Sequence, residues 1–429
     1  MKPLQFGIPY ILVTLEVILE TGFILNTFFL LFCGALVMLM AAGFAMLEAG
    51  MVRSKSVAVI LVKNIGLYAI AGLMFYVVGY NLMYLGVDGG YYGTPTPWVG
   101  DDSAALAGDF SAGYSSYAGW FFQMVFVATA ASIVSGALAE RIKIWPFMAF
   151  VVILTGFIYP VSGSWVWGEG WLYSMGFKDF AGSTLVHSVG GWAALTGALV
   201  LGARKGRFDS EDGEARPLAG SSLPQVALGT FILWFGWFGF NGGSQLSIAS
   251  AEDAMAVAKI FINTNMAAAA GVVTILIINQ MTIKRIDAPM VLNGALGGLV
   301  SITAGPLLPS IPLALGIGAI GAVVMILTSK ALDKLKIDDV VGAIPVHLAC
   351  GIWGTLAVVL SDSEASLITQ ATGIAAIGLF VSISSLALWF IMKVSIGIRL
   401  HWSKEHIGGD LAELGVRAYN LEFNDNEER

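Results

Sequence analysis

The stretch DFAGSTLVHSVGG at residues 179–191 returns later in the chain as DVVGAIPVHLACG at residues 339–351. Both copies follow the pattern D-x2-G-x3-V-H-x3-G, so His187 and His347 hold equivalent places in an internal repeat. The residues that follow His187 are small or apolar, as in a membrane-spanning helix. An ionisable side chain repeated inside two such segments therefore indicates both how the chain folds and where it acts.

The composition places the chain in a membrane. Hydrophobic residues make up 57% of the sequence and charged residues only 12%, whereas a soluble domain carries about 25% charged residues. The apolar residues form long runs, such as YAGWFFQMVFVATAASIVSGALA at 117–139 and VALGTFILWFGWFGF at 226–240. Since about 20 apolar residues cross a bilayer as a helix, we expect an all-α polytopic membrane protein.

The apolar runs predict eleven membrane-spanning helices. The eighth is short and rich in glycine, with the sequence NGALGGLVSITAG. The expected spans are 26–48, 58–84, 117–139, 145–165, 181–202, 225–247, 255–281, 288–304, 312–332, 341–361 and 372–398.

Residues 1–25 fit neither a clean span nor a signal-peptide core, because Glu16 and Glu20 interrupt an apolar segment. We interpret them as an outer segment or an atypical signal. The remaining divisions are a first five-helix repeat (26–202), a cytoplasmic loop (203–224), a second five-helix repeat (225–361), an eleventh helix (372–398) and a cytoplasmic tail (399–429).

The basic residues predict the orientation. Alternate connections hold most of the lysines and arginines, and the other connections hold only Lys178 and Lys259. Because positive charge marks the cytoplasmic side, the N-terminus is expected outside and the C-terminus inside, which requires an odd number of spans. The basic connections contain Arg53, Lys55, Arg141, Lys143, Arg204, Lys205, Arg207, Arg216, Lys284, Arg285, Lys330, Lys334 and Lys336.

The repeated histidines predict an inverted repeat. His187 lies in the fifth expected span and His347 in the tenth, so an odd number of spans separates the two copies and they run in opposite directions. Transporters built in this way place their sites near the middle of the membrane. We therefore expect the two histidines to approach each other from facing helices.

Two interpretations of the histidines remain open from the residues alone. Each histidine can be a hydrogen-bonded helix contact, or the pair can line a path through the membrane. Two neutral imidazoles share one hydrogen bond and add no fixed charge to such a path. Metal binding needs further ligands, and none lies one helical turn away, so no metal and no cofactor are expected.

Aromatic residues form a second candidate site. Phe126, Trp167, Phe240 and Ser244 lie in or beside spans that are expected to end on the outer side. Aromatic faces attract cations by about 0.5–2 kcal/mol, and a serine hydroxyl adds a hydrogen-bond acceptor. The alternative is that these residues are ordinary membrane-interior and interfacial aromatics.

Several other classes of function are disfavoured. The net charge is −7 and the sequence has neither a basic patch nor a nucleic-acid-binding motif. Cys33 and Cys350 both lie in apolar runs and are interpreted as packing residues. No nucleophile–base pair appears outside the expected spans, so an enzyme is not expected.

The sequence resembles the ammonium transporter family (Amt/Mep/Rh), on its Amt side, over nearly the whole length. The motifs that carry the resemblance are GFAMLEAGMVRSK (43–55), GALAERIK (136–143), DFAGSTLVH (179–187), GWFGFNGGS (236–244) and DDVVGAIPVHLACGIWGT (338–355).

The resemblance implies a homotrimer in the cell membrane with one narrow pore in each subunit, for ammonium or ammonia and for methylammonium. It assigns Trp167, Phe126 and Ser244 to an outer site that recruits the cation. Phe126 and Phe240 are assigned to a gate and His187 and His347 to the pore. Asp179 is assigned to a carboxylate near the recruitment site; its competing role is a helix cap, and Asp339 takes the equivalent place on the cytoplasmic side.

The resemblance is incomplete at the tail. The stretch GGDLAELGVRAY at 408–419 only approximates the family's C-terminal motif, and Leu414 stands where relatives often have histidine. This departure bears on regulation by a PII-type signalling protein and not on transport. The alternatives to an ammonium transporter are an ammonium sensor that signals through its cytoplasmic face and a Rh-like electroneutral gas channel.

Overall fold

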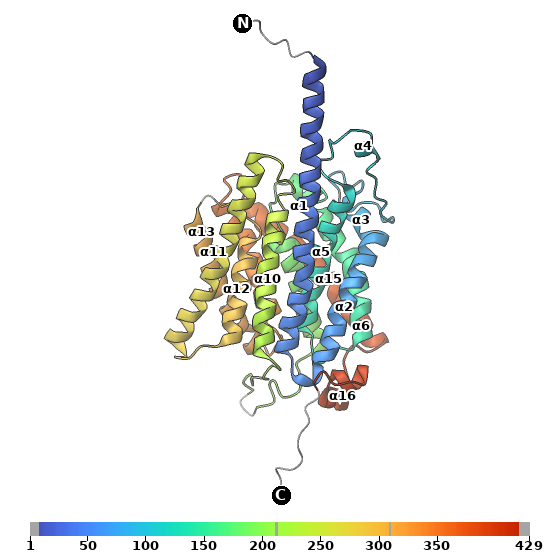
Figure 1. Ribbon diagram of the computed structural model, residues 1–429. Coiled ribbons are helices and arrows are strands. Elements are labelled where there is room, and N and C mark those ends of the chain that lie inside the picture. Colours follow the sequence, from blue (N-terminus) through green and yellow to red (C-terminus); the bar gives the residue numbers. More distant parts are fainter. Residues whose placement is uncertain (1–7, 211–212, 309, 420–429) are drawn as a thin grey trace.

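The protein forms a bundle of long helices that run side by side, and α1 (Ile8–Met51) begins at one end of the bundle while α16 (Trp402–Ile407) lies at the other (Figure 1). The computed structural model describes residues 8–210, 213–308 and 310–419, and side chains from residue 16 onward. Every regular element in these ranges is helical, apart from one isolated bridge between Ile142 and Arg399. The all-helical prediction is thus confirmed.

The α-helices of the bundle are interrupted by short π-helical segments (η2, η3, η4, η5 and η7) and by two 3-10 segments (η1 and η6). In chain order the elements are α1 (Ile8–Met51), η1 (Ser54–Ser56), α2 (Val57–Met74), η2 (Phe75–Gly79), α3 (Tyr80–Tyr84), α4 (Ser103–Leu106), α5 (Ser116–Ala137), α6 (Ile144–Ile153), η3 (Leu154–Ile158), α7 (Tyr159–Ser164), α8 (Trp171–Ser174), η4 (Ser183–Ser188), α9 (Val189–Leu201), α10 (Leu223–Gly243), α11 (Ala251–Thr282), α12 (Ala288–Ile302), α13 (Ile311–Lys334), η5 (Ile344–Ala349), α14 (Cys350–Ala357), η6 (Val358–Leu360), α15 (Leu367–Ser395), α16 (Trp402–Ile407) and η7 (Asp410–Leu414).

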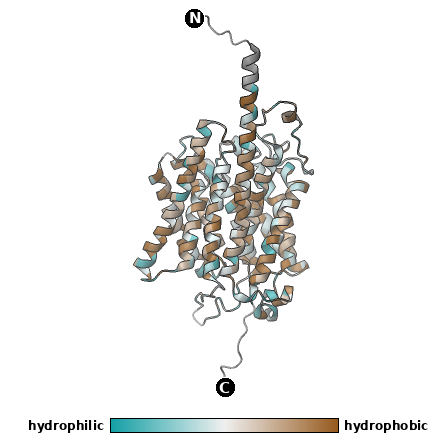
Figure 2. Cartoon of the chain, in the orientation of Figure 1, coloured by the Kyte–Doolittle hydropathy of each residue, from teal (hydrophilic) through white to brown (hydrophobic). Residues whose placement is uncertain are grey.

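Nine helical stretches within the described residues are long and apolar enough to cross a membrane. Two shorter apolar stretches, Ala288–Ile302 and Ile344–Leu360, lie where the eighth and tenth spans were predicted. Hydrophobic residues predominate along the helices (Figure 2), and many large ones are exposed on the outside of the bundle. The chain is therefore a multi-pass membrane protein, and the total of eleven spans stays a prediction.

The first helix begins earlier than the first predicted span. Helix α1 extends without a break from Ile8 to Met51, and its first part projects beyond the bundle (Figure 1). Pro9 lies in the first turn, where the missing N–H is tolerated, and no proline follows before Met51. Glu16 and Glu20 are exposed. Residues 8–25 are thus continuous with the first span, and residues 1–7 of the expected outer segment lie outside the described residues.

Glycines let α1 and α10 pack backbone to backbone. A Cβ atom on Gly229 would lie 2.4 Å from the amide nitrogen of Leu47, and one on Gly43 would lie 3.1 Å from the carbonyl oxygen of Gly229. In lipid the hydrophobic driving force between helices is weak. Small residues at a crossing let the two backbones approach closely, so that van der Waals packing holds the helices together. This close contact holds the α10 residues Trp237 and Phe240 in the core.

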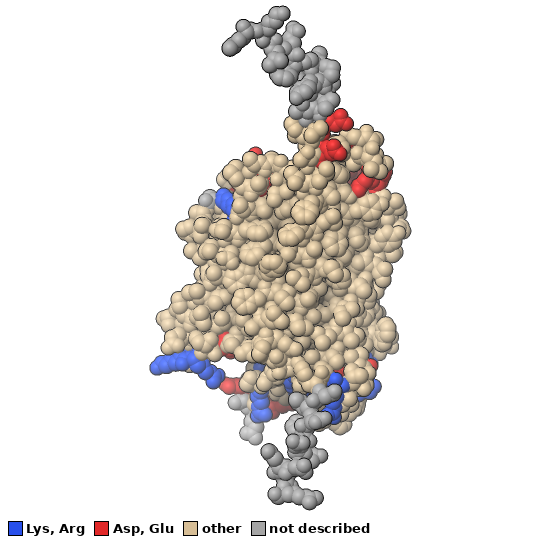
Figure 3. All heavy atoms as spheres, in the orientation of Figure 1, with Lys and Arg blue, Asp and Glu red and all other residues tan. Residues whose placement is uncertain are grey.

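The charged residues separate between the two ends of the bundle. On the face shown in Figure 3, Lys and Arg gather at the end where α16 lies, while Asp and Glu are prominent at the end where α1 begins. The wide middle zone of this face is nearly free of charge. This distribution has the asymmetry that the positive-inside rule describes.

Candidate functional site

The two sequence repeats form the same local structure. Gly182 and Gly342 have φ values of 105° and 76°, in the left-handed region that favours glycine, and each is followed by a π-helical segment that carries the histidine. The backbone N–H groups of Gly182 and Gly342 donate to Asp179 and Asp339, at 3.0 and 3.1 Å. The shared D-x2-G pattern is thus the start of a helical segment in both copies.

His187 and His347 meet in the core. Their Nδ1 atoms lie 3.2 Å apart, within hydrogen-bonding distance, and the residues are 0% and 3% exposed. One Nδ1 must donate and the other must accept, because two protonated or two bare nitrogens would repel. Nε2 of His187 is buried and has no hydrogen-bond partner within the described part of the chain. The predicted approach of the two histidines is therefore present, and an unused polar atom accompanies it.

Aromatic rings cover both sides of the histidine pair. The ring of His187 stacks on Trp237 and Phe240, with centroids 4.9 and 5.3 Å apart, and Phe44 lies 5.9 Å from the ring of His347. Nε1 of Trp237 donates to Thr303 at 2.8 Å, which fixes the indole. The imidazoles therefore lie in a narrow apolar environment.

Phe126 and Phe240 lie next to His187. Their ring centroids are 4.1 Å apart with an interplanar angle of 30°, and the residues are 1% and 0% exposed. Phe240 contacts both Phe126 and His187. The two phenyl rings therefore separate the histidines from the cavity beyond Phe126.

That cavity has a volume of about 820 Å³. Trp167, Asp179 and Ser244 line it together with Phe126. The rings of Phe126 and Trp167 are 6.0 Å apart and nearly perpendicular, at 84°. The hydroxyl of Ser244 donates to the carbonyl oxygen of Phe240 at 2.9 Å, so its lone pairs stay available as acceptors. We call this cavity the vestibule.

The carboxylate of Asp179 is fully engaged by the backbone. Oδ1 accepts the N–H groups of Gly182 and Ser183, and Oδ2 accepts those of Thr184 and Leu185, at 2.8–3.0 Å. The backbone carbonyl oxygen of Asp179 accepts a hydrogen bond from the indole Nε1–H of Trp167 at 2.9 Å. Asp179 thus caps the helical segment that carries His187 and also positions the indole. The capping role is present in the structure, and direct recruitment of a cation by Asp179 stays a prediction.

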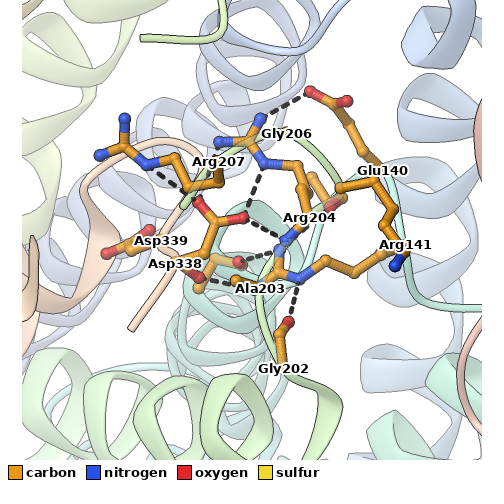
Figure 4. A network of polar contacts seen from close by, with 12 residues as sticks. Glu140, Arg141, Gly202, Ala203, Arg204, Gly206, Arg207, Asp338 and Asp339 are labelled. Atoms are coloured by element: carbon orange, nitrogen blue, oxygen red, sulfur yellow. Dashed lines mark hydrogen bonds and ion pairs between the residues drawn. The ribbon is translucent and has the colours of Figure 1, made fainter. Parts of the chain in front are cut away.

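A buried network of charges joins the helix ends opposite the vestibule (Figure 4). Arg204 pairs with Asp338 at 2.8 Å and with Glu140 at 2.8 Å, and Arg141 donates to the carbonyl oxygen of Asp338 at 2.6 Å. Burial acts to raise the pKa of Asp338, but the hydrogen bonds from Arg204 and the charges of Arg141 and Arg204 outweigh it and hold the pKa at about 2. The network therefore ties the segment before the second repeat to the loops around it.

The C-terminal segment docks on the same end of the bundle. The N–H of Val59, in the first turn of α2, donates to Asp410 at 2.8 Å, and the N–H of Ile144, at the start of α6, donates to Glu413 at 2.8 Å. Carboxylates at helix starts satisfy N–H groups that lack partners within the helix. The tail thus makes defined contacts although its sequence departs from the family motif.

Sequence reasoning missed two kinds of residue near the histidines. Trp237 lies in the motif GWFGFNGGS, and its spacing of three from Phe240 places both residues on one helix face. Glu48 and Lys63 are buried, at 1% and 2% exposure, although both lie in segments predicted as apolar spans. A charged residue inside an apolar run was the available signal.

Within residues 8–210, 213–308 and 310–419, no group of three or more His, Cys, Asp or Glu side chains is arranged to hold a metal ion.

Comparisons with known proteins agree with the sequence motifs. The sequence model of the Ammonium Transporter Family matches residues 28–419. The chain is 41% identical to a putative ammonium transporter of Synechocystis sp., over 95% of this chain and 92% of that protein. It is also 41% identical to the ammonium transporter Amt2 of Archaeoglobus fulgidus, over 91% and 87% of the two chains.

Solved structures share the fold. A structure titled "Sensor Amt Protein" matches with a TM-score of 0.85 and 34% identity, covering 92% of this chain and 99% of that chain. Mep2 of Saccharomyces cerevisiae matches with a TM-score of 0.77 and 24% identity, covering 90% and 91% of the two chains. The latter likeness concerns the fold alone.

Proposed function

This chain belongs to the Ammonium Transporter Family, and from that premise we propose that it takes up ammonium in the vestibule, removes its proton there and conducts ammonia past His187 and His347. It is a transporter and not an enzyme. Methylammonium, a slightly larger cation of the same class, is expected to be a second substrate.

The vestibule concentrates the cation. Trp167 and Phe126 offer aromatic faces that attract a cation by about 0.5–2 kcal/mol. Ser244 lines the same cavity and adds a hydroxyl acceptor. Asp179 holds the indole through its carbonyl oxygen. These residues form the outer recruitment site of the proposal.

The narrow part of the path selects by chemistry. A bare ion is penalised strongly in a low-dielectric interior, and the closely packed, buried rings of Phe126 and Phe240 leave little room for its hydration shell. Ammonium can leave a proton behind and continue as a neutral molecule, whereas potassium cannot. The imidazoles then replace hydrogen bonds that ammonia loses, without adding a fixed charge.

One observation carries this proposal: Phe126 lines the vestibule, its ring packs against Phe240, and Phe240 contacts His187, which lies within hydrogen-bonding distance of His347. The test is to record current from purified protein in lipid bilayers, with ammonium gradients set against potassium gradients. Ammonium current without potassium current supports proton-coupled transport. Ammonium uptake without current would support the electroneutral gas channel instead. Absence of ammonium flux would overturn the proposal.

A sensor function is the second candidate, since one structural neighbour is titled a sensor Amt protein. In that case ammonium would bind in the vestibule and change the contacts of the C-terminal segment at the opposite end. A protein that binds ammonium tightly but shows no flux in the same bilayers would favour this reading.

The proposal includes topology and assembly. We infer eleven spans in a five-plus-five inverted repeat, with the N-terminus outside and the C-terminus inside, in the cell membrane. The charge asymmetry in Figure 3 and the matching caps at Asp179 and Asp339 support this arrangement. A homotrimer and a PII-type partner at the cytoplasmic face complete the proposal and rest on the family alone.

A further inference from the structure

A second, much smaller cavity lies on the other side of His347. It is lined by His347, Phe44, Ser132, Gly136 and Glu48, among mostly apolar neighbours. Its interior has room for about one water molecule. Glu48 is the carboxylate in its wall and lies one turn before the end of α1 at Met51.

The two oxygens of Glu48 are in different situations. Oε2 accepts hydrogen bonds from Ser135 Oγ at 2.7 Å and from Asn64 Nδ2 at 3.2 Å. Oε1 is buried and has no partner among the described residues. Ser135 and Asn64, the partners of Oε2, do not line the cavity, whereas Glu48 does. An unpaired buried oxygen of a carboxylate is costly, which indicates that a ligand satisfies it.

Lys63 balances the charge of Glu48 at a distance. Its Nζ donates to the carbonyl oxygen of Ser135 at 3.0 Å and lies 4.7 Å from the ring centroid of Phe147. In the described structure Ser135 connects the two charges, and no ion pair joins Glu48 to Lys63 directly. The ammonium group of Lys63 therefore stabilises the carboxylate without occupying Oε1.

We propose that Glu48 Oε1 and the cavity beside His347 form an inner binding site for ammonium, at the cytoplasmic end of the path. This inference rests on the proposed function and adds a second cation site to it. An N–H of the cation donates to Oε1, and Phe44 offers an aromatic face. Potassium would exchange its hydration shell for one carboxylate oxygen in an apolar wall, which is far fewer ligands than potassium filters provide.

Lys63 lowers the affinity of the inner site for ammonium. Conduction requires that a site bind its ion strongly enough to attract it and weakly enough to release it. The positive charge beyond Ser135 opposes a second cation on the carboxylate, and so favours release. Gly136 leaves room for the cavity, because a Cβ atom at this position would lie only 2.5 Å from Val341 Cγ2 and 3.4 Å from Glu48 Cγ.

The test measures ammonium current in planar bilayers that hold oriented protein, with ammonium added on one side at a time. Glu48→Gln should raise the half-saturating ammonium concentration on the cytoplasmic side roughly 10-fold or more, because a charged hydrogen bond is lost, and leave the outer value unchanged. Lys63→Met should lower the cytoplasmic value. Glu140→Gln, which removes another buried carboxylate at the same end, is the matched control and should leave both values unchanged.

The outcomes separate this inference from the proposed function. If the wild-type protein carries no ammonium, the transport proposal fails. If it carries ammonium and Glu48→Gln keeps the wild-type cytoplasmic value, or shifts both sides equally, the inner site is overturned. Should Glu48→Gln not assemble, Glu48→Asp keeps the charge but withdraws it by one methylene group. That variant must still weaken cytoplasmic binding alone for the inference to stand.

Discussion

The Nδ1 atoms of His187 and His347 lie 3.2 Å apart, so a single proton joins the two imidazoles across the core of the bundle. His187→Ala removes one partner of this hydrogen bond and widens the narrow path beside Phe240. We expect the variant to lose ammonium transport, to conduct potassium, or to do both. Currents in liposomes with ammonium and potassium gradients measure both effects. Unchanged flux together with unchanged selectivity would show that the pair is only a helix contact.

Trp167→Leu tests the outer site. Leucine keeps apolar bulk but removes the indole face, and the loss of about 1–2 kcal/mol of cation–π attraction predicts a roughly 5- to 30-fold weaker apparent affinity for ammonium. Nε1 of Trp167 also donates to the carbonyl oxygen of Asp179. Trp167→Phe is the control, since it keeps an aromatic face and loses only this hydrogen bond. An affinity equal to that of the wild type in Trp167→Leu would make Trp167 an interfacial anchor.

The sequence alone predicted the helices and the approach of the two histidines, because hydropathy and a repeated residue pattern are properties of the chain itself. It did not predict how far α1 extends, because two glutamates in an apolar run can lie outside the membrane on the same helix. Nor did it predict that Trp237 stacks on His187 or that Ser135 connects Glu48 to Lys63. Those contacts depend on how helices rotate against each other, which no local pattern states.

Acid should destabilise the network around Asp338. Its pKa is held at about 2 against an ordinary value of 3.8, so the folded state favours the ionised form. The stabilisation is present above about pH 4 and is lost as the pH falls toward 2; the shift corresponds to about 2 kcal/mol. The melting temperature of purified protein between pH 6 and pH 2 measures it. Asp338→Asn should be less stable near neutral pH and should lose part of this acid dependence. An acid dependence identical to that of the wild type would contradict the assignment.

The close contact of α1 and α10 predicts that a glycine at the contact tolerates substitution less well than a glycine in open space. In Gly229→Ala the new Cβ atom would meet backbone 2.4 Å away, and overpacking of this kind is destabilising by about 1–3 kcal/mol. Gly316 lies within α13 and a Cβ atom there meets nothing within 4 Å. Gly316→Ala should therefore be neutral or stabilising by up to about 1 kcal/mol. Thermal unfolding in detergent compares the two, and equal stability of both variants would contradict the packing argument.

Asp179 is the hardest residue to assign, because its cap and its place beside the vestibule make different predictions. Asparagine normally caps a helix as well as aspartate does. Here both carboxylate oxygens accept two N–H groups each, and an asparagine side chain offers one oxygen and an NH2 group. Asp179→Asn therefore leaves two N–H groups unpaired, and its loss of stability does not by itself reveal an electrostatic role.

Asp339 supplies the missing control for Asp179. It caps the equivalent segment through Gly342 and Ile344, and is not among the residues that line the vestibule. We expect Asp179→Asn to be inactive and Asp179→Glu to be impaired, while Asp339→Asn loses stability but keeps the outer affinity for ammonium. Ammonium-driven current and thermal unfolding of the same preparations separate affinity from stability. If Asp179→Asn and Asp339→Asn lose stability and transport alike, the carboxylate of Asp179 acts only as a cap, and recruitment of the cation falls to Trp167, Phe126 and Ser244.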